Sequence, residues 1–489
     1  MSLREPLDYV IPDQTAAVAR AAFPKPTAIM RMRDAIGALF FNQEFAHLYH
    51  AEAAAAYSPA RLALITIFQF AEGLSDAQAA SAVGARIDWK YALALPLTEP
   101  GIDPSVLVDF RARLIAGAAE LLLFTTLLER FTEQGLLRKP GRVRTDATHV
   151  LAAIRTLGRL ECIGETLPQA LNALARVAPH WLRHCVPESR LTTYAERFDD
   201  YRLPEAKDKR IALAEQIGQD GRLLLHLLAD PLSPAGLLEL PAVLVLRQVW
   251  QQQFYPAVAQ QPLRLRTAQD LAPSAELICS PIDAQARFSI KRETRWTGYK
   301  VHLTESCDPS GPNLITDLQT TLATTPDSVV LPTIQAALIE RDLAPAEHLL
   351  DAGYVSAATV VCSQSEQIDL IGPARGEGGW QTRSAGALTA RQFVLDWEAK
   401  QVTCPAGKLS RRWSATKGRT GQEQISVQFG APDCRPCALR SGCVASQTRP
   451  RAMTLLPQAQ QRPCRRHANG SRRRALAHSS GYGRVSRAR

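Results

Sequence analysis

Two aspartates could bind a metal ion together and support phosphodiester chemistry. Asp146 lies within Arg144-Thr-Asp-Ala-Thr148, and Asp351 ends a short apolar run just before Gly353. Mg²⁺ prefers oxygen ligands and keeps several waters, so few carboxylates suffice to hold it. Two such ions can activate a water or a 3′-hydroxyl and stabilise the leaving oxygen. The chain has 47 acidic residues, and an aspartate at a strand end is more often a turn former or helix cap. The pair alone is therefore weak support for a catalytic site.

Four cysteines form a second candidate site. Cys434 and Cys437 are separated by two residues, Cys443 follows, and Cys404 lies thirty positions upstream of Cys434. Four thiolates that include a C-x₂-C pair suit tetrahedral Zn²⁺. Such a zinc would be structural, because four protein ligands leave no open position for chemistry. The alternative is a set of reduced, partly buried thiols.

The elements before these sites are helical from about residue 27 to 137. The segment Ser58–Gly73 has proline just after a potential cap and glycine at its far end, as helices prefer. Ser75-Asp-Ala-Gln78 is a capping box that opens a second helix, Asp76–Val83. The two helices could form a helix-turn-helix-like unit or an αα-hairpin within a helical bundle.

Strand patterns begin at Val143–Ile154 and return after a helical stretch of about 160–262. If the strands that carry Asp146 and Asp351 are neighbours, both carboxylates can reach one metal although they are 205 positions apart. His149 is expected to point away from Asp146 and to pack rather than bind metal, since strand side chains alternate. The later strands are predicted at Gly298–Glu305, Leu314–Leu322, Glu347–Gly353 and Ile368–Pro373, with helices at Ser328–Arg341 and Ser356–Ser365.

Several short segments of the sequence resemble bacterial insertion-sequence transposases of the DDE class, and the resemblance extends over roughly residues 20–459. Those that resemble the catalytic domain of this family are Arg144–Thr148, Trp296–Glu305 and Leu349–Tyr354. Those that resemble its helical N-terminal domain are Tyr57–Leu64, Glu72–Ala80, Ala85–Leu93 and Val106–Leu114. The resemblance implies an α/β RNase H-like catalytic domain, here interrupted by an all-helical insertion and preceded by an all-α domain. The family also carries cysteines near its C-terminus, as this chain does.

The resemblance further implies binding to transposon terminal inverted repeats and target DNA, with metal-dependent strand cleavage and transfer. Asp146 and Asp351 match the first two acids of the catalytic triad, which binds Mg²⁺ or Mn²⁺. A homo-oligomer on DNA is expected, because two transposon ends must be brought together. The residues predicted to contact DNA are Arg61, Lys90, Arg111, Arg113 and Lys300. The alternative for Arg111, Arg113 and Lys300 is simple exposure to solvent.

The third acid of the family, a glutamate on a helix after the cysteine region, has no counterpart in the sequence. No Asp or Glu occurs from Cys434 to Arg489; the last candidates before it are Glu377, Asp396, Glu398, Glu423 and Asp433. We therefore expect a transposase copy that is inactive in strand transfer. The alternatives are a noncatalytic DNA-binding remnant and a metal-dependent nuclease.

The positive net charge of +10 comes from the end of the chain. Residues 461–489 carry nine arginines and no acid, whereas the remainder has 48 basic and 47 acidic residues. This tail has too few apolar residues to form a core. It is expected to be either a disordered basic arm or out-of-frame sequence that follows a frameshift near Ala459.

The 489 residues suffice for several domains. The predicted divisions are an N-terminal extension at 1–26, a DNA-end-binding helical domain at 27–137 and an RNase H-like domain at 138–375. A cysteine-containing region at 376–459 and the tail at 460–489 follow. The N-terminus has no signal pattern, and no apolar run approaches the roughly 18 residues needed to span a bilayer. A cytoplasmic protein without a membrane partner is therefore expected.

Overall fold

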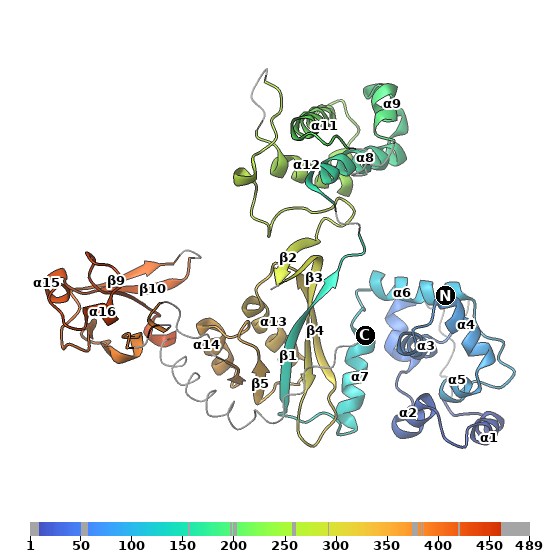
Figure 1. The fold of residues 1–489 in the computed structure, drawn as a ribbon. Helices are drawn as coiled ribbons and strands as arrows, with labels where there is room; N and C mark the ends of the chain where they lie inside the picture. Colours follow the sequence, from blue (N-terminus) through green and yellow to red (C-terminus); the bar gives the residue numbers. More distant parts are fainter. Residues whose placement is uncertain are drawn as a thin grey trace. The chain divides into compact units, whose positions relative to one another are not determined.

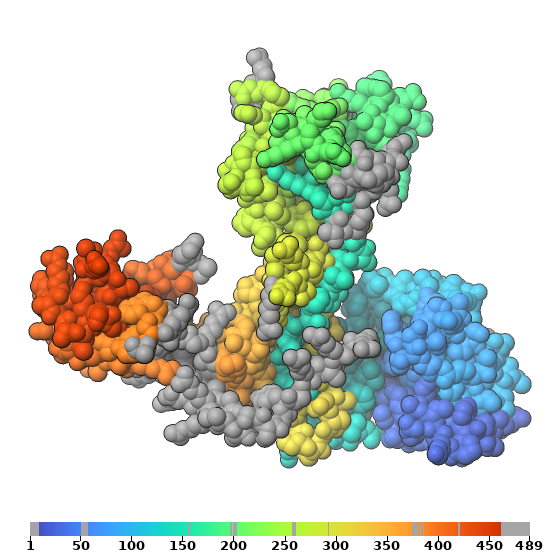
Figure 2. Space-filling model, in the orientation of Figure 1, coloured from blue at the N-terminus to red at the C-terminus, as the bar shows by residue number. Residues whose placement is uncertain are grey.

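The computed structural model describes residues 9–49, 57–154, 157–195, 198, 203–256, 261–291, 293–373, 380–382, 384, 386–418 and 421–460. The predictions for the tail at 461–489 and for Glu377 lie outside these residues. The chain forms two compact units, residues 1–141 with 306–314, and residues 142–305 with 315–489. Figures 1 and 2 colour them by position along the chain. In the described part, no helix is both long enough and apolar enough to cross a bilayer.

The first unit is helical (blue to cyan in Figure 1). Its core contains the aromatic side chains of Phe45, Phe68, Trp89 and Phe110. The helices are α1 Asp13–Ala22, α2 Ala28–Ile36, the 3₁₀ turn η1 Asn42–Leu48, α3 Pro59–Glu72, α4 Asp76–Ala85, α5 Ile87–Ala92, α6 Pro104–Ala116 and α7 Leu122–Glu133.

The predicted helix pair is confirmed at α3 and α4. The Ser58 side chain caps α3 by accepting from the backbone N–H of Arg61, and Gly73 ends it in the left-handed conformation at φ 67°. Glycine has no Cβ to oppose that conformation. Ser75 and Gln78 form the predicted capping box of α4.

The second unit contains a mixed sheet with strand order β2-β3-β1-β5-β6, in which β4 also pairs with β3. Strands β2 and β4 run antiparallel to β3, whereas β1, β5 and β6 pair in parallel. The strands are β1 Arg142–Leu151, β2 Arg287–Lys291, β3 Thr294–Ser306, β4 Ile315–Leu322, β5 Glu347–Leu350 and β6 Asp369–Ile371. Helix α13, Asp327–Glu340, joins β4 to β5, and α14, Ala357–Ser365, joins β5 to β6. A mixed α/β fold after a helical region is thus confirmed; β2 was not predicted.

The helical insertion between β1 and β2 has a core of its own. It contains α8 Arg159–Val177, α9 Pro179–Cys185, α10 Glu188–Thr193, α11 Lys207–Leu228, α12 Pro241–Gln253 and the 3₁₀ turns η3 Leu237–Glu239 and η4 Ala268–Asp270. The Trp250 indole packs directly on α11, where its N–H donates to the carbonyl oxygen of Gly218 at 2.8 Å. A Cβ on Gly221 would overlap the Trp250 ring. The two helices can therefore approach this closely because residue 221 has no side chain.

The C-terminal part of this unit is built from short strands. Strands β9 Arg412–Lys417, β10 Glu423–Gln428 and β11 Ala452–Leu455 form an antiparallel sheet, and β7 Val394–Asp396 pairs with β8 Gln401–Thr403. Short helical turns lie at η5 Trp380–Thr382, η6 Ala390–Gln392, α15 Ala431–Cys434 and α16 Arg440–Cys443. Its small core is formed by Phe393, Val402, Val427, Phe429, Met453 and Leu455.

Replacing Gly221 by valine tests the packing of the insertion. The new side chain meets the Trp250 ring, so we expect about 1–3 kcal/mol of local destabilisation. Amide hydrogen exchange should become faster across α11 and α12. The control is Gln216→Val, at an exposed position of the same helix. Equal exchange in the two variants would contradict this account of the packing.

Candidate metal centre

The pairing of β1 with β5 brings Asp146 and Asp351 to adjacent positions. The two strands run parallel, and their paired residues end at Thr145 opposite Leu350. Asp146 follows Thr145 within β1, and Asp351 is the first residue after β5. Neighbouring strands lie about 4.8 Å apart, so the two side chains begin side by side at the point where the pairing of β1 with β5 ends. The condition on which the predicted metal pair depended, adjacency of the two strands, is therefore met.

Both carboxylates are exposed and have few protein partners. Asp146 Oδ1 accepts from the backbone N–H of Ala147, and Asp351 Oδ1 accepts from that of Gly353, each at 2.8 Å. Within the described residues, neither carboxylate forms an ion pair with a lysine or arginine. Their remaining oxygen lone pairs can coordinate a divalent cation or accept hydrogen bonds from its bound waters.

A third aspartate, which the sequence did not single out, lies beside them. Asp327 begins α13, and one of its oxygens accepts from Lys300 Nζ at 2.7 Å. Nearby, the buried phenol of Tyr354 has its hydroxyl 2.6 Å from His302 Nδ1. Burial raises the pKa of Tyr354, and the charges of Asp327, Asp351 and Asp146 raise it further. Proline followed by aspartate is a common sequence at the start of a helix. It does not indicate a functional site, so the position of Asp327 near Asp351 could be found only from the fold.

Buried polar groups join the three central strands below the acids. The Thr145 hydroxyl lies 2.7 Å from Thr304 Oγ1 of β3 and 2.6 Å from His348 Nε2 of β5. His348 is fully buried, and its Nδ1 has no hydrogen-bond partner among the described residues. Burial lowers the pKa of His348 to about 3, so this imidazole is neutral near pH 7. Farther along β1, His149 packs against the Trp296 ring of β3 at 5.3 Å between centroids.

The basic residues predicted to contact DNA in the first unit all have partners within it. Arg61 donates to the carbonyl oxygens of Leu93 and Ala94, and buried Lys90 donates to that of Leu97. The Arg61 bonds hold α3 to the turn that follows α5, and the Lys90 bond holds that turn to α5 itself.

The remaining predicted DNA contacts are also engaged. Arg111 forms an ion pair with Asp76 at 2.7 Å, and the Arg113 guanidinium lies over the Tyr49 ring. Lys300 is 13% exposed and paired with Asp327. Their contact with DNA stays a prediction. A phosphate could reach only those N–H groups of the guanidinium and ammonium groups that these protein contacts leave exposed.

The helical unit also carries a family signature. Residues 17–113 match a family model described as a transposase domain (DUF772). The match begins within α1 and ends within α6, so it includes the capped α3–α4 pair. It supports a transposase family for this chain. No curated protein and no solved structure matches the chain.

The cysteines lie outside the segment that matches the transposase domain, and all four line one small cavity of about 30 Å³. Cys404 follows β8, and Cys434 ends α15. Cys437 lies in the loop after α15, and Cys443 ends α16. None of them forms a disulfide. Burial raises the pKa of the Cys443 thiol, which the nearby Arg451 guanidinium partly offsets. As placed, no three cysteine, histidine or acidic side chains of the described residues are close enough together to hold a metal.

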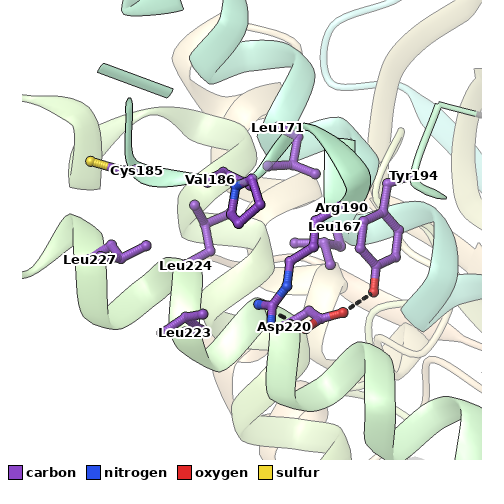
Figure 3. Close-up of a pocket in the computed structure, with 11 residues that line it drawn as sticks. Leu167, Leu171, Cys185, Val186, Arg190, Tyr194, Asp220, Leu223, Leu224 and Leu227 are labelled. Carbon is purple, nitrogen blue, oxygen red and sulfur yellow. Dashed lines mark hydrogen bonds and ion pairs between the residues drawn. The ribbon is translucent and has the colours of Figure 1, made fainter. Parts of the chain in front are cut away.

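A further pocket lies in the helical insertion and is mainly apolar (Figure 3). Leu167, Leu171 and Leu224 line it, and Asp220 lies at one side. This carboxylate accepts from the Tyr194 hydroxyl at 2.7 Å and pairs with Arg190 at 3.0 Å. Because both of its oxygens are engaged, the pocket offers no free acid for chemistry.

The buried His348 gives the fold a specific pH dependence. In the unfolded chain its imidazole takes up a proton near pH 6.5, whereas the folded state keeps it neutral down to about pH 3. Its contribution to stability is thus complete above pH 6.5 and is lost as the pH falls toward 3, by at most about 1.4 kcal/mol per pH unit. The variant His348→Gln should lose less stability than the wild type between pH 6.5 and 4.5 in urea unfolding followed by circular dichroism. Identical losses in the two proteins would contradict the assignment.

Proposed function

We propose that this chain is, by descent, a DDE-type transposase of a bacterial insertion sequence. Its helical N-terminal unit binds the transposon terminal inverted repeats, and its mixed sheet is an RNase H-like catalytic domain that acts on these ends and on target DNA. The chain works as a homo-oligomer on DNA. The observation that carries the proposal is the parallel pairing of β1 with β5, which ends one residue before Asp146 and Asp351. The transposase-domain match over residues 17–113 supports it from an independent part of the sequence.

The residues at the sheet end fit a divalent cation. Asp146 and Asp351 offer oxygen ligands of the kind that Mg²⁺ and Mn²⁺ prefer, and each is bonded only to a backbone N–H among the contacts described. Bound there, such ions would supply activation of a water or 3′-hydroxyl and stabilise the leaving oxygen. The work of the protein is positioning. The hydrogen bonds of Thr145 to β3 and β5 fix the two strands from which the carboxylates project.

Strand transfer by this copy is proposed to be weak or absent. None of the acids that remain as candidates for the third position lies on a helix after the cysteines. Glu423 opens β10, Asp396 ends β7, and Asp433 is held by Arg411. From Cys434 onward the sequence contains no acid. DNA binding by the N-terminal unit does not depend on that acid and is proposed to remain.

A cleavage and joining assay on DNA that carries the element's terminal repeats tests this function. We expect binding to the repeats, and little joining in Mg²⁺ or Mn²⁺. Any cleavage should fall to background in Asp146→Ala and persist in Glu340→Gln, whose side chain is exposed at the far end of α13. Binding without cleavage would identify a noncatalytic remnant, and cleavage without joining a nuclease. No preference for the terminal repeats over unrelated DNA would contradict the proposal, and efficient joining would contradict its inactivity.

We also propose that Cys404, Cys434, Cys437 and Cys443 hold a structural Zn²⁺. Their convergence on one cavity and the C-x₂-C pair support this, because thiolates are preferred zinc ligands. The ion would link β8 to the two short helical turns that carry the other cysteines, in a region whose apolar core is small.

Zinc content and thermal stability test the cysteine site. We expect about one Zn²⁺ per chain by elemental analysis. The content should fall, together with the melting temperature, in Cys437→Ser. Cys362→Ser, which removes a thiol outside the cavity, should retain the metal. A chain that purifies without zinc and binds none on titration would rule the site out.

A further inference from the structure

The cysteine-containing region carries an excess of positive charge that the longer part of the chain before it does not. Residues 376–459 contain 12 lysines and arginines and 5 acids, whereas residues 1–375 contain 36 and 42. The net charge is +7 over the first of these ranges and −6 over the second. A local basic surface attracts the phosphates of nucleic acid even when the charge of the surrounding protein is not positive.

Most of the basic side chains in this region lie at the surface. Arg440 and Arg451 donate to backbone carbonyl oxygens, and Arg411 forms an ion pair with Asp433. Six further basic side chains are exposed, and among the described residues none of them forms an ion pair with an acid: Lys400, Lys408, Arg412, Lys417, Arg435 and Arg449. Much of the positive charge is therefore available to a partner.

One face of the β9-β10-β11 sheet (orange to red in Figure 1) has no acid among its strand residues. Side chains alternate between the two faces of a strand. Trp413, Val427 and Met453 are paired across the three strands and pack in the core. The opposite face, called the outer face below, carries Arg412, Ser414 and Thr416 of β9, Gln424, Ser426 and Gln428 of β10, and Ala452 and Thr454 of β11.

The composition of the outer face fits the backbone of DNA. All of its side chains except that of Ala452 can donate a hydrogen bond, and Arg412 is positively charged and exposed. Many of the hydrogen bonds that proteins make to DNA go from Arg, Ser, Thr and Gln side chains to phosphate and sugar oxygens. A carboxylate on this face would repel phosphate. Strand β9 extends over about 17 Å, which corresponds to about five nucleotide steps along one DNA strand.

We propose that the outer face of the β9-β10-β11 sheet binds the DNA backbone, with Arg412 as its charged contact. The inference rests on the proposed function, which supplies DNA as the partner. It adds a DNA contact outside the helical N-terminal unit. Because contacts to phosphate and sugar carry no direct sequence information, this face contributes affinity for the terminal repeats and for unrelated DNA alike.

The salt dependence of DNA binding by the full chain tests this surface. Affinity is measured by fluorescence anisotropy on two duplexes, one with the element's terminal repeat and one of unrelated sequence. Each phosphate contact contributes about 0.9 to the steepness with which log K falls against log salt. Arg412→Gln should therefore weaken binding on both duplexes by the same factor and reduce this slope by about one.

The matched control is Lys400→Gln, which removes the same charge from the turn between β7 and β8. Trp397 of this turn contacts the Trp413 ring at 5.3 Å between centroids, and Trp413 points away from the outer face. Lys400 therefore belongs to the other side of the sheet, and its variant should keep the wild-type slope.

A second variant keeps Arg412 in place. Gln428 lies opposite Arg412 in the register of β9 and β10, so Gln428→Glu puts a carboxylate of nearly the same size beside the guanidinium. Opposite charges at paired strand positions stabilise a sheet, so the melting temperature should stay the same or rise. DNA binding should nevertheless weaken on both duplexes, because the carboxylate competes with phosphate for Arg412. Weaker binding without loss of stability is a result that a merely structural role of this face does not produce.

The outcomes separate this inference from the proposed function. If the wild type prefers the terminal repeat but Arg412→Gln and Gln428→Glu keep its affinity and slope, the outer face does not bind DNA, although the proposed function stands. An equal change of slope in Lys400→Gln would overturn the inference, because the charge of the whole region would then act rather than this face. A lower melting temperature in Arg412→Gln with an unchanged slope would mean that the face packs against an acidic part of the same chain instead. A wild-type chain that binds neither duplex would contradict both proposals.

Discussion

The parallel pairing of β1 with β5 is the constraint on which the candidate site depends. Parallel neighbours cannot be joined by a tight turn and need a crossover connection. The chain between the two strands here contains the whole helical insertion, the β2–β4 strands and α13. A register shift of one residue would place Asp146 and Asp351 on different faces of the sheet. The buried contacts of Thr145 with Thr304 and His348 oppose such a shift, because breaking them would leave polar groups without partners in the core.

The second strand neighbour of β1 is fixed by a close backbone approach. A Cβ on Gly298 of β3 would overlap the carbonyl oxygen of Val150 in β1. The absence of a side chain there lets β3 lie against β1 while its other edge pairs with β2 and β4. The two buried histidines of these strands, His302 and His348, are neutral near pH 7, because burial lowers the pKa of each. The hydrogen bonds that they form therefore add no positive charge beside the acids. Negative charge is concentrated at the surface end of the strands, where a cation can reach it.

Local patterns in the sequence predicted most of the elements, whereas Asp146 and Asp351 were singled out by the family resemblance of the residues around them. The Ser58 and Ser75 caps are short-range signals, and both were predicted. Strand β2 was missed because Arg287–Lys291 is short and mostly exposed, so it lacks a buried alternation. The partners of the basic residues could not be predicted either. Arg111 meets Asp76 across 35 positions, a contact that only helix packing creates.

Asp327 illustrates the same limit at the site. Its sequence context is that of an acid in the first turn of a helix, where a carboxylate is favoured by the helix dipole in any protein. That oxygens of Asp327 and Asp351 both lie close to Gly353 depends on where α13 begins relative to β5, which no local pattern specifies. The cysteines behaved differently, because the C-x₂-C spacing already restricts where two of the four thiols can lie, and the fold brings the other two to the same cavity.

Two aspartates 205 positions apart are proposed to share one cation where the pairing of two parallel strands ends. A crystal structure of the full chain soaked in Mn²⁺, with anomalous diffraction recorded at the manganese edge, tests it most directly. We expect an anomalous peak within bonding distance of carboxylate oxygens of both Asp146 and Asp351. Manganese bound elsewhere, or two aspartates that point away from each other with no peak between them, would contradict it.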